Sequence, residues 1–215
     1  QGFPDREIAN TLKEVFPNFH EINFEAVVRS NRPDILAFTV QHAKLEQKAS
    51  QLYTYNAARF GNLLALKQLH ESGFVLHEAC ARVAAEQNNL ACLQYAHANG
   101  CKFDKFKYIN AAQGGHLDCI KYAHEHGLEW HADVCKEAAL NGHLDCLQFA
   151  HESGCPWDDK TTKGAAQEGH VDCLAYAHEN GCPWKTEIYF TSAKKGHLHC
   201  MQYAFSQGLE WHADV

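Results

Sequence analysis

Glycine recurs every 27 residues through most of this chain. Leucine, cysteine and tryptophan recur at the same interval, each in its own column. Self-similarity at one period of this length is typical of stacked arrays, in which each unit buries its apolar face against its neighbours. The repeat therefore predicts a solenoid, and it favours a binding surface over an active site. The glycine column comprises Gly73, Gly100, Gly127, Gly154, Gly181 and Gly208.

Each unit contains the signals of two short helices. In the unit at residues 131–157, small alanines mark a first helix over Ala132–Leu140. Apolar residues at helical spacing mark a second helix over Leu144–Glu152. A turn is expected at Gly142, and the recurring glycine is expected to end the second helix in the left-handed conformation. The sequence therefore predicts an all-α helical solenoid.

About seven units are expected to follow an N-terminal helical cap at residues 1–19. The first unit is a looser copy, in which Val27-Val28 replace the alanine pair of later units. Atypical terminal units cover the open end of a solenoid. The chain begins at Gln1 without an initiator methionine, which predicts a processed or shortened form. The array is expected over residues 20–215, with units at 20–49, 50–76, 77–103, 104–130, 131–157, 158–184 and 185–211.

Two segments, AAQGGHLD at residues 111–118 and AALNGHLD at 138–145, resemble the Ala-Ala-x-x-Gly-His-Leu-Glu segment of the ankyrin repeat family. The GCPW stretch at 154–157 lies where that family has Gly-Ala-Asp-Val. Ankyrin units usually have about 33 residues and a Thr-Pro-Leu-His motif, which is absent here. The resemblance therefore implies an ankyrin-like array with shortened or missing β-hairpins, whose function is to bind protein.

Short units of this kind also resemble arrays encoded by giant DNA viruses, amoebae and intracellular eukaryotic parasites. That resemblance implies an effector or adaptor that binds a partner protein, such as a host signalling kinase. The alternative is a ubiquitin-ligase substrate adaptor in which residues 1–49 contact the ligase. A metal- or redox-responsive module that uses the cysteines is a third reading.

Residues of the first helices change from unit to unit, which indicates that packing does not dictate them. In ankyrin-like stacks the first helices and the turns before them line the concave side. These residues are therefore expected to face outward and contact a partner, with a merely solvated face as the alternative. The candidates are Lys105, Lys107, Tyr108, Asp133, Lys136, Lys160, Lys163, Glu187 and Tyr189.

The recurring His-x-x-Cys pairs, such as His116 and Cys119, imitate zinc ligands. Structural zinc needs four converging ligands, and Asn89 replaces the histidine beside Cys92 without loss of the repeat. The histidine is instead expected at the start of the second helix, bonded to a neighbouring turn. No metal, cofactor or small-molecule substrate is expected.

Two other columns are expected to pack between units. The tryptophans could alternatively form an aromatic binding stripe, because tryptophan is enriched at interaction hot spots. A large apolar residue stands at that position in every unit, which favours packing. The columns are His70, His97, His124, His151 and His178, and Trp130, Trp157, Trp184 and Trp211.

Ten cysteines invite a disulfide interpretation. Equivalent residues of neighbouring units are expected roughly 8–10 Å apart, whereas a disulfide needs Cα atoms within about 7 Å. The cysteines are therefore expected to be packing residues of a protein in a reducing compartment, the cytoplasm or nucleus, including a host cytosol after secretion. A pair such as Cys119 with Cys135 stays open.

Charge and composition argue against several functions. The net charge of −7 disfavours a general nucleic-acid binder, which carries a basic patch. No apolar run approaches the roughly 18 residues that a bilayer requires. No nucleophile with a base and an orienting group stands at a readable spacing, so the chain is not expected to be an enzyme. A monomer with a protein partner is expected.

Overall fold

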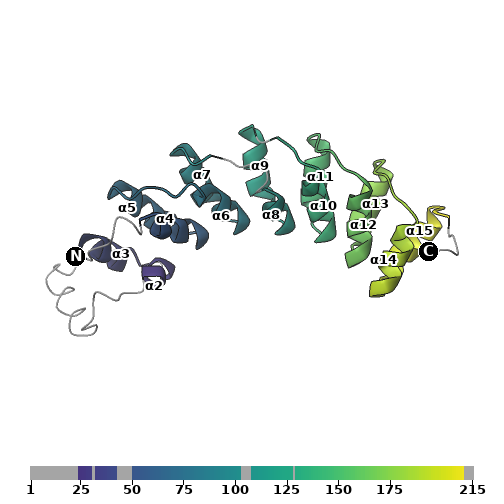
Figure 1. Ribbon diagram of the computed structural model, residues 1–215, viewed down its shortest axis with the longest axis horizontal. Helices are drawn as coiled ribbons and strands as arrows, with labels where there is room; N and C mark the ends of the chain where they lie inside the picture. The colour runs from purple at the N-terminus through teal and green to yellow at the C-terminus, as the bar shows by residue number, and fades with distance from the viewer. Residues whose placement is uncertain (1–23, 31, 43–49, 103–107, 128, 211–215) are drawn as a thin grey trace. The chain divides into compact units, whose positions relative to one another are not determined.

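The computed structural model describes residues 24–30, 32–42, 50–102, 108–127 and 129–210. These residues are helical throughout apart from turns and short connections, and no strand occurs among them (Figure 1). The all-α prediction is confirmed, whereas the predicted cap at residues 1–19 lies outside the described residues. The helices are α2 (Phe24–Arg29), α3 (Pro33–His42), α4 (Ser50–Arg59), α5 (Leu63–Glu71), α6 (Cys80–Glu86), α7 (Leu90–Ala98), α8 (Tyr108–Gln113), α9 (Leu117–Glu125), α10 (Asp133–Leu140), α11 (Leu144–Glu152), α12 (Asp159–Glu168), α13 (Val171–Glu179), α14 (Glu187–Lys195) and α15 (Leu198–Ser206).

Each predicted unit contains one helix pair, from α2 and α3 to α14 and α15. The sequence predicted one continuous array, but the contacts divide the described residues into two compact bodies. The N-terminal body comprises those up to Ala84 together with residues 91–102, and the C-terminal body comprises residues 85–90 and those beyond 107. In the N-terminal body α2 packs on α4, α3 on α5, and α4 on α5.

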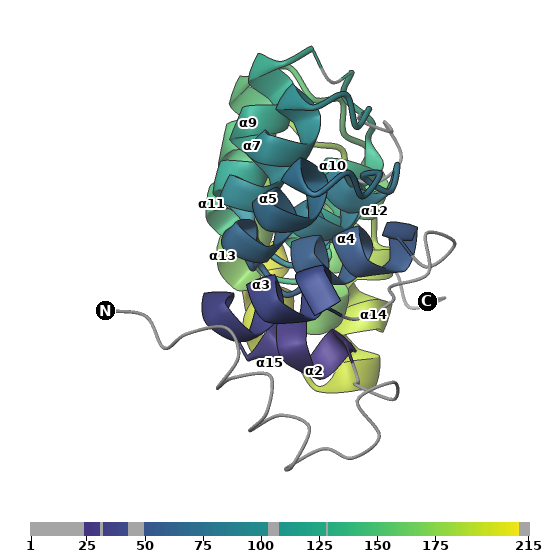
Figure 2. The ribbon, with the colours of Figure 1, turned by 90° about the vertical axis from the view of Figure 1, so that its left-hand side faces the viewer.

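The C-terminal body contains two rows of helices. The first helices α8, α10, α12 and α14 pack side by side, and so do the second helices α9, α11, α13 and α15. Figure 2 shows α10, α12 and α14 on the right and α9, α11 and α13 on the left. The alanine pairs let the first helices approach one another, since Ala138 and Ala139 are completely buried. Between the rows, Ile120, Leu147 and Leu174 are also completely buried, and burying one such side chain contributes about 1.5–3 kcal/mol.

The recurring glycine follows the second helix in each of the last six units, from α5 to α15, as predicted. Gly154 has φ +87°, a left-handed conformation that side chains with a Cβ rarely adopt. Its N–H donates to the carbonyl of His151, and the N–H of Cys155 donates to the carbonyl of Ala150 at 2.9 Å. These two bonds satisfy carbonyls that the end of a helix leaves without partners. The chain then turns away through Pro156, which cannot continue the helix.

A histidine at the start of each second helix of the C-terminal body, from α9 to α15, contacts the turn of the preceding unit. The Nε2 atom of His143 lies 3.0 Å from the carbonyl oxygen of Gln113. The same imidazole covers Gly115 so closely that a Cβ on this glycine would lie 2.5 Å from Nδ1. Gly115 also has φ +71°, so both the turn and the contact require glycine. The predicted bond of this histidine to a neighbouring turn is confirmed.

Asn62 replaces that histidine in the N-terminal body and makes equivalent bonds. Its Nδ2 donates to the carbonyl of Val28 at 2.9 Å, in the preceding unit. Its Oδ1 accepts from the N–H of Ala65 at 2.9 Å, which caps α5. The repeat therefore needs a side chain that reaches back to the turn, and it does not need a metal ligand.

The second histidine column and the tryptophans stack on each other between units. The rings of His151 and Trp157 lie 3.7 Å apart between centroids, at an angle of 11°. Nδ1 of His151 lies 3.0 Å from the hydroxyl of Tyr176 in the next unit. His178 stacks in the same way on Trp184. Trp130, Trp157 and Trp184 are half-buried packing residues, as predicted, whereas Trp211 lies outside the described residues. The tyrosine partner was not predicted from the sequence.

One junction lacks this hydrogen bond, because Phe149 stands where neighbouring units have tyrosine. Phe149 meets His124 edge to face, with ring centroids 6.0 Å apart, much as Tyr176 meets His151 at 5.8 Å. Nδ1 of His124 is buried, and no hydrogen-bond partner for it occurs among the described residues. His124 also stacks less closely on Trp130, at 4.8 Å. The histidine of this junction therefore lacks the hydrogen bond that His151 and His178 make at the next two junctions.

All ten cysteines are buried and none forms a disulfide, which includes Cys119 and Cys135. The thiol of Cys182 donates to the carbonyl of Asp158 at 3.2 Å, across its own unit. Burial raises the pKa of Cys146 and Cys173 from about 9 to about 12. The thiolate is the reactive form, so these side chains behave as small apolar residues at neutral pH.

We predict that Phe149→Tyr stabilises the protein by about 1 kcal/mol, because the new hydroxyl reaches the unpaired Nδ1 of His124. Urea unfolding measures the change. The matched control is Tyr176→Phe, which removes the equivalent bond from His151 and should destabilise by about 1–3 kcal/mol. Equal stability of all three proteins would contradict the role given to this bond.

We predict that iodoacetamide at pH 8 modifies the native thiols only as fast as the protein unfolds, whereas the urea-unfolded chain gains ten groups within minutes. Intact-mass spectrometry counts the groups. The raised pKa values have a second effect: the stability that the neutral thiols contribute is complete below about pH 9 and is lost as the pH rises to about 12. Rapid modification of the native protein would show that the cysteines are accessible.

Candidate functional site

Three equivalent positions on each of the first helices α10, α12 and α14 are exposed or half-exposed. They follow the spacing i, i+3 and i+7, which brings side chains onto one face of a helix. Because α10, α12 and α14 lie side by side, the three faces form one continuous surface. We call this surface the first-helix face. Its residues are Asp133, Lys136 and Leu140 on α10, Lys160, Lys163 and Gln167 on α12, and Glu187, Phe190 and Lys194 on α14.

Five of the nine residues predicted to contact a partner belong to this face, and the structure brings them together on neighbouring helices. Lys105 and Lys107 lie outside the described residues. Whether any of the nine contacts a partner stays a prediction. The five on the face are Asp133, Lys136, Lys160, Lys163 and Glu187.

The expectation that Tyr108 and Tyr189 face outward is wrong, because their side chains are only 2% and 3% exposed. The hydroxyl of Tyr189 donates to the carbonyl of Leu209 at 2.6 Å, at the end of the second helix of the same unit. In the preceding unit, the hydroxyl of Thr162 donates to the carbonyl of Pro183 at 2.8 Å. This column therefore belongs to the buried framework, and two of its members, Thr162 and Tyr189, make the same type of contact with different side chains.

Ion pairs connect neighbouring first helices across the face. Nζ of Lys163 on α12 lies 2.5 Å from a carboxylate oxygen of Glu187 on α14. Two further pairs, Lys195 with Glu168 and Lys185 with Asp159, join the same two units. The hydrogen bond from Lys185 lowers the pKa of Asp159 below its ordinary value. Exposed pairs of this kind contribute little to stability, so these charges stay accessible to a partner.

A groove of about 530 Å³ lies between α12 and α14. The sequence analysis selected two of its residues, Lys163 and Glu187, but not Phe190, whose side chain is 54% exposed. The signal that could have found it is its column, in which Lys136 and Lys163 are the equivalents of Phe190. The lining comprises Lys163, Gln167, Glu187, Phe190, Thr191, Lys194 and Lys195.

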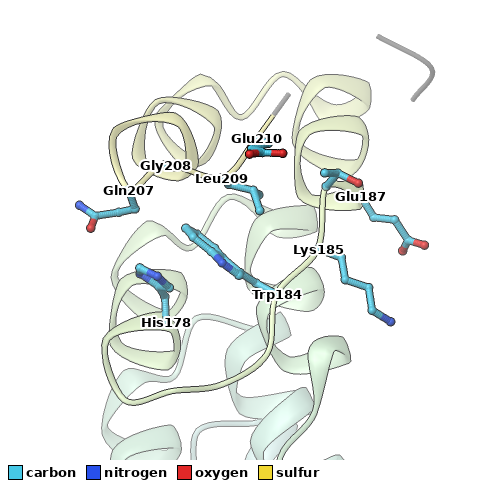
Figure 3. Close-up of a pocket in the computed structure, with 9 residues that line it drawn as sticks. His178, Trp184, Lys185, Glu187, Gln207, Gly208, Leu209 and Glu210 are labelled. Carbon is cyan, nitrogen blue, oxygen red and sulfur yellow. The ribbon is translucent and has the colours of Figure 1, made fainter. Parts of the chain in front are cut away.

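A second hollow, of about 610 Å³, lies at the turns before and after the last described helix pair (Figure 3). The Trp184 side chain lies between His178 and Leu209 in this view. The hollow is lined by Leu209 and Glu210 where the preceding unit has Cys182 and Pro183 after its glycine. It shares Glu187 with the first-helix face, and its other lining residues lie outside that face.

The described residues contain no group of three or more His, Cys, Asp and Glu side chains that could hold a metal ion. Within the same ranges, no helix has both the length and the apolar character needed to cross a membrane.

No family model and no curated protein matches this chain. Among solved structures it is similar to the crystal structure of the human ASB11 ankyrin repeat domain, with a TM-score of 0.64 and 16% sequence identity. The match covers 75% of this chain and 84% of that one. It shows that the fold is an ankyrin-type helical solenoid. The resemblance to short viral and parasite arrays stays a prediction.

We predict that Tyr189→Ala destabilises the protein by about 3–5 kcal/mol, because it leaves a cavity and removes the bond to Leu209. The matched control is the adjacent Phe190→Ala, which removes an exposed ring and should change stability by about 0.5 kcal/mol or less. Urea unfolding of the two variants makes the comparison. Similar stabilities would contradict the assignment of Tyr189 to the framework.

Proposed function

We propose that this chain is a protein-recognition module, an effector or adaptor that binds its partner through the first-helix face. One observation carries the proposal. Fixed columns such as the alanine pairs and the cysteines of the second helices are buried at the contacts between helices, whereas the varying residues of the first-helix face are exposed or half-exposed.

The column that contains Lys163 illustrates the argument. Its members are Ile109, Lys136, Lys163 and Phe190, on successive first helices. Two positions further along each helix, by contrast, the residue is Ala111, Ala138 or Ala165, all completely buried, followed by the buried Ser192. Stacking limits the second column to small residues and leaves the first unrestricted. The varied chemistry of the first column is therefore attributed to something outside the array, namely a partner.

The charges of the face favour a protein over a nucleic acid. Asp133, Lys160 and Glu187 occupy equivalent positions with alternating sign. A polyanion would favour a uniformly basic surface, whereas a mixed surface with an exposed Phe190 matches the mixed charge and apolar anchors of protein interfaces. The net charge of −7 for the chain also disfavours a nucleic-acid partner.

The narrower proposal is that a monomer of this chain binds a host signalling enzyme, such as a kinase, in the cytoplasm or nucleus. It is motivated by the resemblance to arrays of giant DNA viruses, amoebae and intracellular parasites. The ten buried, unpaired cysteines support a reducing compartment.

No observation favours the ubiquitin-ligase alternative over this proposal. Of the residues assigned to the ligase contact, 1–23 and 43–49 lie outside the described residues. The helices α2 and α3 pack on α4 and α5, as the first unit of an array does. Val27 and Val28 are buried in that contact, so this segment already has a structural role.

Site-specific photo-cross-linking tests the proposal. Benzoylphenylalanine replaces Lys136, Lys163 or Phe190, one on each first helix of three successive units. We expect these three proteins, irradiated in a eukaryotic cell lysate, to cross-link to one common partner, which mass spectrometry identifies. A signalling enzyme among the products would support the narrower proposal.

The matched controls carry the same cross-linker on the second helices of the same units, at the exposed positions Asp145, Asp172 and Gln202. We expect these proteins to lack the common partner. A partner that cross-links from the second helices and not from the first would contradict the proposed face.

A further inference from the structure

We propose that the groove between α12 and α14 binds an acidic segment of the partner that contains one apolar side chain. This inference depends on the proposed function and specifies the chemistry that the first-helix face recognises. Its observations are an exposed aromatic ring and a local excess of lysine in a chain with a net charge of −7.

The apolar part of the groove is Phe190. Its side chain is 54% exposed, although the equivalent position holds Lys136 and Lys163 in the preceding units. The framework therefore tolerates a polar residue here, and the ring does not fill a gap in the stack. Exposed aromatic side chains are frequent anchors of protein interfaces, because they bury a large area at a small cost in conformational entropy. Phe190 is thus suited to contact an apolar side chain of the partner.

The charged part of the groove consists of three lysines and one glutamate. Lys163 is paired with Glu187, and Lys195 is paired with Glu168 outside the groove lining. Lys194 makes no ion pair among the described residues. Counting Glu187 and Glu168, the three lysines leave one positive charge in excess. Carboxylates of the partner that displace these two glutamates would also contact Lys163 and Lys195. The groove therefore complements an acidic segment.

The lysines flank the ring from both sides. Lys163 reaches the groove from α12, and Lys194 follows Phe190 by one helical turn on α14. Residues four apart share a helix face, so this lysine and the ring are neighbours. An extended segment with acidic residues before and after one apolar residue would place its ring or aliphatic chain on Phe190 and its carboxylates on the lysines.

A fluorescein-labelled peptide, Gly-Ser-Asp-Glu-Phe-Asp-Glu-Ser-Gly, tests the chemistry by fluorescence anisotropy. We expect saturable binding that weakens at least tenfold when its Phe becomes Ala or its acids become Asn and Gln. Binding should also weaken as the salt concentration rises from about 50 to about 300 mM. Salt screens the charges of the two partners, and the Debye length is already only about 10 Å at 0.1 M. Absence of binding up to about 1 mM, or equal binding of the neutral peptide, would overturn the proposal.

Variants of the protein locate the binding site. Phe190→Ala should weaken peptide binding by about tenfold, and Lys194→Glu by at least as much. Both residues are exposed, so the variants should fold, and thermal unfolding verifies this. Lys102→Glu is the matched control, because it changes the same charge at an exposed position outside the first-helix face, and should leave the affinity within about twofold. Equal losses in all three variants would overturn the assignment to this groove.

An oligothymidylate of ten residues distinguishes a general anion site from a peptide site. We expect it not to compete with the peptide, because it has negative charge without the carboxylate–apolar pattern. Tighter binding of the oligonucleotide than of the peptide would overturn the proposal. Failure of the peptide with intact cross-linking from Lys163 and Phe190 would contradict only the chemistry, whereas loss of that cross-linking would contradict the proposed face itself.

Discussion

The array depends on the contact between an imidazole and a glycine of the preceding turn. His143 lies over Gly115 and bonds the carbonyl of Gln113, so it fixes both the separation and the orientation of two successive units. A side chain on that glycine would push the histidine away, and a change in the turn would remove the acceptor. The close packing of the alanine pairs follows from this spacing, because small residues are useful only where helices already approach closely. The stacking of histidine on tryptophan occupies the remaining space between the second helices.

The period of the sequence was sufficient to predict most of the fold. The second helix predicted over Leu144–Glu152 has those bounds in the structure, because its leucines, its glycine and its proline are all local signals. Partners 25 residues apart, such as His151 and Tyr176, were not found, since a pairing across units has no signature at the period itself. Tyr189 was assigned to the surface because its column varies from unit to unit. A varying column indicates exposure only where a single residue type can make the buried contact. In this column the hydroxyl of either a threonine or a tyrosine donates to a backbone carbonyl, so the residue varies although it is buried.

The candidate site illustrates the converse limit. Charged residues and two tyrosines were selected for the surface. Lys163 and Glu187 lie there, but Phe190 was not among the candidates although its side chain is exposed. Only the arrangement of α12 beside α14 shows that the ring has no neighbour to cover it fully. The ion pairs between these helices also matter for recognition. A partner segment must replace these intramolecular ion pairs with ion pairs of its own. The pairs therefore select a segment with matching charges more than they increase the affinity.

The junction between His124 and Phe149 has a mechanical consequence. In a linear array each unit contacts only its neighbours, so resistance to opening is a property of individual interfaces and not of the whole. At this interface a buried nitrogen has no hydrogen-bond partner among the described residues, and the rings lie 4.8 Å apart, whereas those of His151 and His178 lie less than 4 Å from their tryptophans. We therefore expect it to yield before the two interfaces that follow it. Strain applied to the C-terminal body would therefore concentrate between α9 and α11, and the three units beyond that point would move as one piece.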